Sequence, residues 1–257
     1  MKPDHGLAGQ ALAPSGFHDH PGRIRTSEAA RQGRPPHRDG AAIEVRGLTR
    51  RFGARTVLDQ INLTIGAGER AGIWGPNGSG KTTLLRCLAG TLTPSAGHAL
   101  VLGQPSGSPA ARHALGVCLG QERAFYARLS GRENLLFAAR LRMRPGAVTR
   151  AVAAVCDELA LGPFIDRPVE RCSSGMRARL ALARTLLGDP RVILLDEPAR
   201  SLDDPASQLV QAALGRRPDL TVVIASPRRE DLAWCSRVID LAAMAAHRQP
   251  VRDPASR

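Results

Sequence analysis

A glycine-rich loop holds the residues of this chain best suited to chemistry. Residues 75–83 read Gly-Pro-Asn-Gly-Ser-Gly-Lys-Thr-Thr and fit the spacing G-x-x-x-x-G-K-[ST]. In such a loop, glycines let backbone N–H groups turn toward a polyphosphate, Lys81 reaches the terminal phosphates, and the Thr82 hydroxyl can ligate magnesium. The predicted nucleotide-binding residues are Gly75, Pro76, Asn77, Gly78, Ser79, Gly80, Lys81, Thr82 and Thr83.

The segments on either side of the loop have the order that this chemistry requires. Residues 71–74 are apolar and predict a buried strand, and residues 83–89 predict a helix that Gly90 closes. A chance glycine-rich turn is the alternative. It is disfavoured because the chain has only two lysines, Lys2 and Lys81, so a lysine at this loop position is hard to attribute to composition.

A second motif places two acids at the end of a strand. Residues 191–198, Arg-Val-Ile-Leu-Leu-Asp-Glu-Pro, predict an apolar strand followed by Asp196 and Glu197. Asp196 would hold magnesium directly or through water, and Glu197 would face the attacking water as a general base. An ordinary buried strand ending in a solvated turn is the alternative for this segment alone. Together with the glycine loop, the acids indicate a magnesium-nucleotide site.

Between these motifs lie residues 172–184, Cys-Ser-Ser-Gly-Met-Arg-Ala-Arg-Leu-Ala-Leu-Ala-Arg. Here the chain resembles the nucleotide-binding domain of ABC transporters, whose signature Leu-Ser-Gly-Gly-Gln also starts a helix just before the acidic strand. Ser173 and Gly175 match that signature, whereas Cys172, Ser174 and Met176 depart from it. The resemblance implies ATP and Mg²⁺ as ligands and a role in ATP hydrolysis.

The same resemblance implies contacts across a dimer of ATP-binding subunits, either a homodimer or a heterodimer. The residues expected to contact nucleotide held by the partner are Ser173, Ser174, Gly175 and Met176. A helix N-terminus with a serine hydroxyl is an anion site. A plain serine N-cap is the alternative.

Three further positions match the family one by one. Phe52 stands where a ring stacks on adenine, although a core position is the alternative. Gln121 matches a catalytic glutamine that contacts magnesium and the attacking water, with an exposed polar turn as the alternative. Asp203 matches an aspartate that faces the partner subunit, and a helix-capping acid is the alternative.

The order of elements predicts an α/β fold. The resemblance makes it a P-loop ATPase core with a mostly parallel sheet, an antiparallel β part and a helical subdomain at about residues 123–188. Residues 130–133 form a capping-box pattern, and Val148, Val152, Val155 and Leu159 have helical spacing. The ATP-binding domain is predicted at residues 41–245, and the polar, proline-rich ends, 1–40 and 246–257, are predicted to be disordered. Residues 241–257 replace a further strand of the family and predict a shortened terminus.

Composition limits the partners. The net charge of +13 fits nucleic acid, an anionic membrane face, or an arginine-rich composition. Because the arginines are scattered and few aromatics accompany them, no nucleic acid is expected. The chain holds no apolar run typical of a secretory signal or a membrane span. Five widely spaced cysteines suggest reduced thiols in a cytosolic protein.

The resemblance therefore implies a peripheral subunit on the cytoplasmic face of the inner or plasma membrane, paired with separate integral membrane permease subunits. Residues 122–135 look most like exporters of the ABC-2 type. One position departs from the family. The strand at residues 221–226 is followed by Pro227, where the family has a histidine that contacts the terminal phosphate. Proline has no donor, so a nucleotide-gated regulatory subunit with little ATP turnover is the alternative function.

Overall fold

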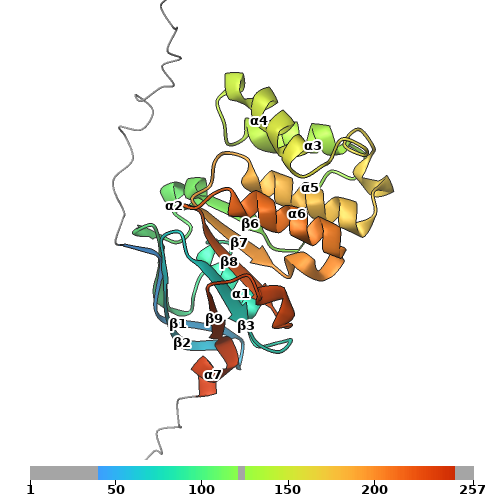
Figure 1. Cartoon of the computed structure of the whole chain (residues 1–257). Helices are drawn as coiled ribbons and strands as arrows, with labels where there is room; N and C mark the ends of the chain where they lie inside the picture. Colours follow the sequence, from blue (N-terminus) through green and yellow to red (C-terminus); the bar gives the residue numbers. More distant parts are fainter. Residues whose placement is uncertain (1–39, 121–124, 247–257) are drawn as a thin grey trace, which may run out of the picture. The chain divides into compact units, whose positions relative to one another are not determined.

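The structure is a computed structural model that describes residues 40–120 and 125–246. Two β-sheets flanked by helices make up this part (Figure 1). The strands are β1 (Ala41–Phe52), β2 (Arg55–Gly66), β3 (Arg70–Trp74), β4 (Ala96–Val101), β5 (Gln104–Pro105), β6 (Leu115–Cys118), β7 (Val192–Asp196), β8 (Thr221–Ser226) and β9 (Arg237–Asp240). The helices are α1 (Lys81–Leu88), α2 (Pro109–Ala114), α3 (Gly131–Arg140), α4 (Pro145–Glu158), α5 (Ser174–Leu186), α6 (Asp204–Gly215) and α7 (Leu241–Ala246), and short 3₁₀ turns include η2 (Val169–Arg171), η3 (Pro198–Ser201) and η4 (Glu230–Leu232).

The parallel sheet gathers the ends of three strands at one edge. Its order is β6–β7–β8–β3–β9, and all neighbouring strands run parallel. The register pairs Trp74 with Ser226 and Asp196 with Ala225. The loops that follow β3, β7 and β8 therefore leave the sheet at the same edge, which is where open α/β sheets bind ligands.

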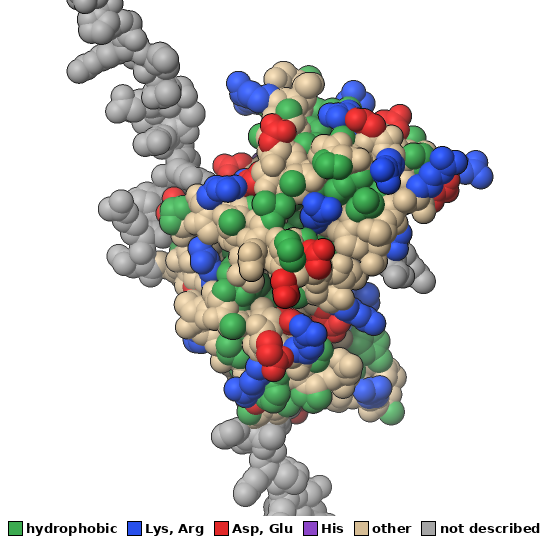
Figure 2. Space-filling model, turned by 45° about the vertical axis from the view of Figure 1, so that its right-hand side comes forward, with side chains coloured by type: hydrophobic (Ala, Val, Ile, Leu, Met, Phe, Trp, Pro, Cys, Tyr) green, Lys and Arg blue, Asp and Glu red, His purple; other side chains and the backbone are tan. Residues whose placement is uncertain are grey.

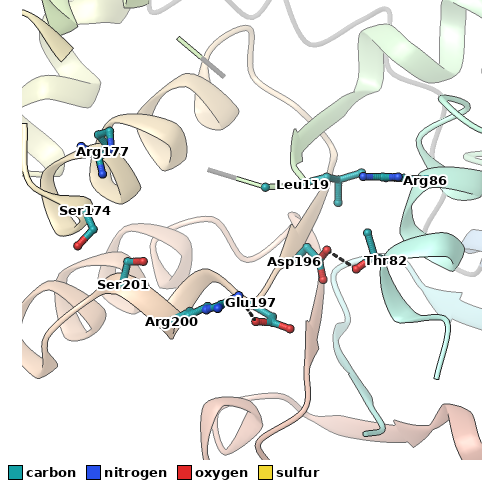
Figure 3. Close-up of a pocket in the computed structure, with 10 residues that line it drawn as sticks. Thr82, Arg86, Leu119, Ser174, Arg177, Asp196, Glu197, Arg200 and Ser201 are labelled. Carbon is teal, nitrogen blue, oxygen red and sulfur yellow. Dashed lines mark hydrogen bonds and ion pairs between the residues drawn. The ribbon is translucent and has the colours of Figure 1, made fainter. Parts of the chain in front are cut away.

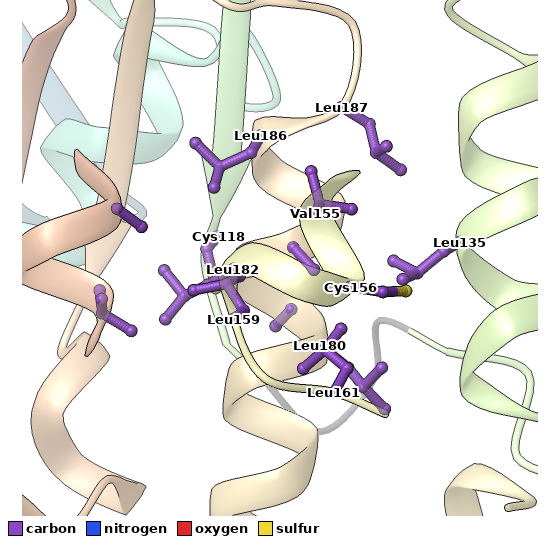
Figure 4. Packing of buried hydrophobic residues seen from close by; sticks show 14 of the residues in the cluster. Cys118, Leu135, Val155, Cys156, Leu159, Leu161, Leu180, Leu182, Leu186 and Leu187 are labelled. Atoms are coloured by element: carbon purple, nitrogen blue, oxygen red, sulfur yellow. The ribbon is translucent and has the colours of Figure 1, made fainter. Parts of the chain in front are cut away.

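Both faces of this sheet are buried, because successive side chains of a strand point to opposite faces. On β7, Ile193 and Leu195 belong to the core that includes α3, α4, α5 and α6, part of which is drawn in Figure 4. Val192 and Leu194 belong to a second core, which includes α1 and the antiparallel sheet. The uninterrupted apolar run before Asp196 is thus explained by burial on two sides.

The antiparallel sheet has the order β2–β1–β4–β5. A tight turn joins β1 to β2, with Phe52 paired to Arg55 and Gly53 at φ +58°. Ile43 and Leu48 of β1 are fully buried in the second core. The predicted α/β fold, with a parallel sheet and an antiparallel part, is confirmed.

Helices α3, α4 and α5 form the helical subdomain. The predicted capping box at the start of α3 is present, because Glu133 N donates to Ser130 Oγ (3.2 Å) and Ser130 N donates to Glu133 Oε2 (2.8 Å). The predicted apolar stripe is also buried: Val148, Val152, Val155 and Leu159. Helix capping and periodicity therefore predicted α3 and α4 correctly.

The predictions made from composition concern the cysteines, membrane spans, the arginines and the chain ends. Four cysteines are buried, Cys235 is half-buried, and all five are free thiols. No helix of the described part combines the length and apolarity of a membrane span. Arginine side chains are scattered over the face drawn in Figure 2 rather than gathered in one stripe. The predicted tails lie outside the described residues apart from Gly40 and Ala246.

Candidate nucleotide-binding site

The predicted phosphate loop joins β3 to α1, as its chemistry requires. Gly80 is the N-cap of α1 with φ +97°, a left-handed conformation that glycine adopts without strain. A Cβ at Gly80 would lie 2.8 Å from Leu58 Cδ2, so a larger residue would collide there. Helix α1 begins without a side-chain cap, which leaves its first N–H groups available to an anion.

Lys81 is buried at the start of α1, and the loop itself holds its ammonium group. Nζ donates hydrogen bonds to Gly75 O (2.7 Å) and Pro76 O (3.0 Å). Burial lowers the pKa of Lys81, and the carboxylates of Glu197 and Asp196 act in the opposite direction. The lysine is therefore close enough to both predicted acids to interact with them.

Thr82 and Asp196 meet across the edge of the sheet. Thr82 Oγ1 donates a 2.6 Å hydrogen bond to Asp196 Oδ2 (Figure 3). The other carboxylate oxygen of Asp196, Oδ1, is buried and has no hydrogen-bond partner in the described part of the chain. A buried carboxylate oxygen without a partner is unfavourable unless a cation or water engages it.

This pair fits magnesium. A hydroxyl and a carboxylate are the hard oxygen ligands that Mg²⁺ takes, usually one or two from the protein with phosphates and water completing the shell. No group of three or more His, Cys, Asp and Glu suited to a metal occurs among residues 40–120 and 125–246. The described chain thus offers Thr82 and Asp196 rather than a dedicated cage.

Glu197 follows in a strained conformation. Its φ is +49°, and left-handed backbone costs a non-glycine residue about 1–2 kcal/mol. Its N–H donates to Ala225 O on β8 (2.8 Å), which fixes the backbone. The Glu197 side chain is 28% exposed, and its Oε2 pairs with Arg200 Nη1 at 3.5 Å (Figure 3). The predicted general base is therefore held next to Asp196, a predicted metal ligand, with the guanidinium of Arg200 against it.

An open cleft of about 590 Å³ brings these groups together. Its lining includes the acids and Thr82, and also arginines from three elements, α1, α5 and η3: Arg86, Arg177 and Arg200. Arginines and acids in one cleft suit a polyphosphate that binds together with a divalent cation.

The start of α5 lines the same cleft through Ser174. Ser173 Oγ accepts from Met176 N (3.2 Å), and Ser173 N donates to Met176 Sδ (3.4 Å). The serine N-cap given as the alternative is therefore present, and a role across a dimer stays a prediction. A Cβ at Gly175 would lie 3.1 Å from Ser201 O, so glycine allows α5 to approach η3 closely.

The remaining predicted residues have mixed outcomes. Asp203 caps α6 by accepting from Ala206 N (2.9 Å), as its alternative proposed. Phe52 is 46% exposed with the Arg50 guanidinium 4.5 Å from its ring centroid, so the core interpretation is wrong and adenine stacking stays a prediction. Gln121 lies outside the described residues.

Pro227 follows β8 at the position where a histidine was expected. Its carbonyl accepts a hydrogen bond from Trp74 Nε1 (3.1 Å). The next residue, Arg228, donates to Asp231 Oδ1 (2.6 Å), and Asp231 also accepts from the buried Ser226 hydroxyl (2.6 Å). These contacts hold the loop after β8; Pro227 has no donor, and the Arg228 guanidinium is paired with Asp231 through Nε and Nη2.

Sequence reasoning missed the three arginines of the cleft, Arg86, Arg177 and Arg200, and the contact of Trp74 with Pro227. Arg200 had a local signal, because it lies three positions after Glu197, a spacing that brings side chains together on a helical turn. Trp74 had none, since Pro227 is 153 positions away in the chain.

Comparisons with known proteins agree with this geometry. A family model described as ABC transporter matches residues 58–200. The "Nod factor export ATP-binding protein I" of Rhizobium meliloti is 37% identical over 180 residues, which are 69% of this chain and 53% of the relative. The "Sulfate/thiosulfate import ATP-binding protein CysA" of Bordetella parapertussis is 37% identical over 207 residues, 77% of this chain and 58% of the relative. The chain spans a little over half the length of these curated relatives.

A solved structure supports the fold. A dimeric ATP-binding cassette bound to ADP and Pi matches with a TM-score of 0.70 and 21% identity, covering 78% of this chain and 95% of that chain. The family match itself extends over more than half of the sequence. This chain therefore belongs to the ABC transporter family, and its described part has the fold of an ATP-binding cassette.

Proposed function

We propose that this chain binds Mg-ATP in the cleft, hydrolyses it, and acts as the ATP-binding subunit of an ABC transporter. The observation that carries the proposal is the contact of Thr82 with Asp196 beside the uncapped start of α1. It places a cation site against an anion site, which is the combination that a magnesium-nucleotide requires. Family membership supports ATP as the nucleotide.

Each predicted residue of the cleft has its own role in this function. Lys81 exchanges its hydrogen bonds to loop carbonyls for bonds to the phosphates, and Thr82 and Asp196 hold Mg²⁺. When bound, the ion neutralises charge on the phosphates. Glu197 accepts the proton of the attacking water, a role that its place beside Asp196 supports. Gln121 contributes a further contact to the ion and the water.

A second ATP-binding subunit, identical or related, completes the site. Its contacts with the terminal phosphate come from the signature residues Ser173, Ser174, Gly175 and Met176, while Asp203 faces the partner. Two features support this dimer. The cleft is open to solvent, and the N-terminus of α5 lies at its wall, where it can bind an anion.

Separate integral membrane permease subunits bind the helical subdomain. Four of the six large apolar side chains exposed in the described part lie on α3, at its C-cap or in the segment before it: Tyr126, Leu129, Phe137 and Leu141. Tyr126 and Phe137 pack edge to face with ring centroids 5.2 Å apart. Such a patch suits an apolar partner surface, and this partner would keep the chain peripheral on the cytoplasmic face of the membrane.

We assign export as the direction. Relatives named for export and for import are equally identical to this chain, at 37%. The assignment therefore rests on residues 122–135, which resemble exporters of the ABC-2 type.

One observation favours a second candidate, a nucleotide-gated regulatory subunit with little turnover. Pro227 has no side-chain donor, and Arg228 is engaged by Asp231. If the missing contact acts in the transition state, its loss costs about 10²- to 10³-fold in rate. The retained Glu197 argues against complete loss of hydrolysis.

The test is magnesium-dependent ATP turnover by the purified chain, with ATP binding measured in parallel. Variants Pro227→His and Glu197→Gln are compared with Thr149→Ala, an exposed threonine on α4. If the chain is an ATP-hydrolysing transporter subunit, wild-type turnover is expected to be close to that of Pro227→His. Glu197→Gln is then expected to lose turnover and to keep ATP binding. Tight binding with turnover only in Pro227→His supports the regulatory subunit. A folded chain that binds no ATP refutes both.

A further inference from the structure

The loop after β8 begins with Pro227, which has no side-chain donor, where the family has a histidine that contacts the terminal phosphate. The carbonyl of Pro227 is engaged by Trp74 Nε1, and Arg228 is paired with Asp231. The next residue, Arg229, lies with its guanidinium 4.1 Å from the centroid of the Trp74 ring. The residues that follow β8 in this loop therefore make contacts with Trp74 and Asp231.

Arg200 offers a cation from the opposite side, on η3. It lines the cleft, and its Nη1 lies 3.5 Å from Glu197 Oε2 (Figure 3). A general base must lie one water molecule away from the phosphorus that the water attacks. A guanidinium already against that base is therefore within a side-chain rotation of the terminal phosphate. The Arg200 side chain is 80% exposed, and exposed ion pairs are weak, so this pair exchanges readily.

The other two arginines of the cleft are less suited. Arg177 donates through Nη1 to Cys172 O, which fixes its guanidinium at the start of α5. Arg86 lies four residues after Thr82, one helical turn beyond the end of α1 that binds phosphate. Only Arg200, among these three, pairs with the predicted base.

We propose that Arg200 contacts the terminal phosphate of ATP in place of the missing histidine, and that its pair with Glu197 is its position before ATP binds. This inference rests on the proposed function. A guanidinium donates in a planar fork that matches a phosphate, and the phosphate carries more charge than one carboxylate. Transfer of Arg200 to the phosphate frees the Glu197 carboxylate for the attacking water. ADP lacks the terminal phosphate and leaves the pair intact.

The experiment measures binding of Mg-ADP and of a non-hydrolysable Mg-ATP analogue by calorimetry. Arg200→Ala is expected to weaken binding of the analogue about tenfold and to leave ADP binding unchanged, because one charge-assisted contact is lost. Its ATP turnover is expected to fall about 10²-fold. Arg200→Lys keeps the positive charge but lacks the planar guanidinium. Its affinity for the analogue and its ATP turnover are expected to lie between those of the wild type and Arg200→Ala. Arg150→Ala, an exposed arginine on α4, is the matched control.

A double variant tests whether a histidine at position 227 can replace Arg200. Adding Pro227→His to Arg200→Ala is expected to restore the preference for the ATP analogue over ADP. The inference is overturned if Arg200→Ala leaves that preference unchanged, or if it raises turnover, since Arg200 would then only restrain Glu197. A wild-type chain that binds neither nucleotide refutes the proposed function itself, whereas normal binding and turnover in Arg200→Ala refute this inference alone.

Discussion

Thr82 Oγ1 and Asp196 Oδ2 are 2.6 Å apart, although 114 positions separate the two residues in the chain. Thr82 lies on α1, which follows β3, and Asp196 ends β7. These two strands are not neighbours, because β8 lies between them in the parallel sheet. Helix α1 closes the gap by packing on both β7 and β8. The sheet order and the packing of α1 therefore bring the glycine-rich loop and Asp196 together.

Asp196→Asn keeps the shape of this contact and removes its charge. We expect ATP affinity in the presence of Mg²⁺ to fall at least about tenfold, because even outer partners of a metal ligand contribute that much to metal affinity. ATP affinity in EDTA should stay unchanged. Calorimetric titrations with and without Mg²⁺ measure both, with Asp157→Asn, an exposed aspartate on α4, as the control. An equal response to Mg²⁺ in Asp196→Asn would place the ion elsewhere.

The backbone conformation of Glu197 lowers the stability of the fold. Its φ of +49° is unfavourable for any residue except glycine, so Glu197→Gly should stabilise the fold by about 1 kcal/mol while ATP turnover is lost. Glu197→Gln should lose turnover without this gain, because the strain remains. Urea unfolding at pH 7 measures the difference between the two variants. Equal stabilities would mean that the backbone relaxes at this position.

The local parts of the fold could be predicted from sequence. The phosphate loop, the apolar strand before Asp196 and the capping box at Ser130 depend on residues within one or two turns of each other. Each such pattern carries its own physical reason, such as glycine at positive φ or a hydroxyl at a helix N-cap. Helix α1, strand β7 and helix α3 followed from these patterns.

Contacts between distant segments could not be predicted. The hydrogen bond from Trp74 to Pro227 and the network of Ser226, Arg228 and Asp231 depend on which strands become neighbours. The sequence left Phe52 open between ring stacking and a core position, because an aromatic ring at a strand end gives no local sign of what covers it; only the core alternative is wrong. The Arg200 pair was missed although its spacing was local, because the turn η3 was not predicted.

Asn134 fixes the segment that carries the exposed apolar patch. Its side chain is buried, accepts from Tyr126 N (2.8 Å), and donates to the carbonyls of Tyr126, Leu129 and Ser130. Asn134→Ala leaves Tyr126 N unpaired and removes a second partner from the three carbonyls, so it should destabilise the fold by about 1–3 kcal/mol. Urea unfolding measures the loss, and limited proteolysis should cut residues 125–130 faster.

The matched control for Asn134 is Asn62→Ala. Asn62 also bonds to backbone, accepting from Gly47 N (2.9 Å) and donating to Gln60 O (2.9 Å), but it is exposed, so water replaces the lost bonds. Its cost should stay below about 1 kcal/mol. Equal costs for the two variants would contradict the role given to burial at Asn134.

Glu158 on α4 forms an ion pair with Arg217, which follows α6, and the strength of this ion pair depends on pH. Its carboxylate accepts from Arg217 Nη1 (2.7 Å) and Nη2 (2.8 Å) and is 14% exposed. The hydrogen bonds from Arg217 lower the pKa of Glu158 below its ordinary value of 4.5. Because the folded state favours the charged form, the stabilisation is fully present above pH 4.5 and is lost as the pH falls through the lowered pKa.

Glu158→Gln should therefore lower the free energy of unfolding by about 1–2 kcal/mol at pH 7. The difference from wild type should shrink as the pH falls below 4.5, because the wild-type carboxylate is then protonated as well. Urea unfolding at several pH values measures this, with Glu170→Gln, an exposed glutamate on η2, as the control. A difference that stayed constant down to pH values below the lowered pKa would assign the loss to packing of the glutamate side chain instead of its charge.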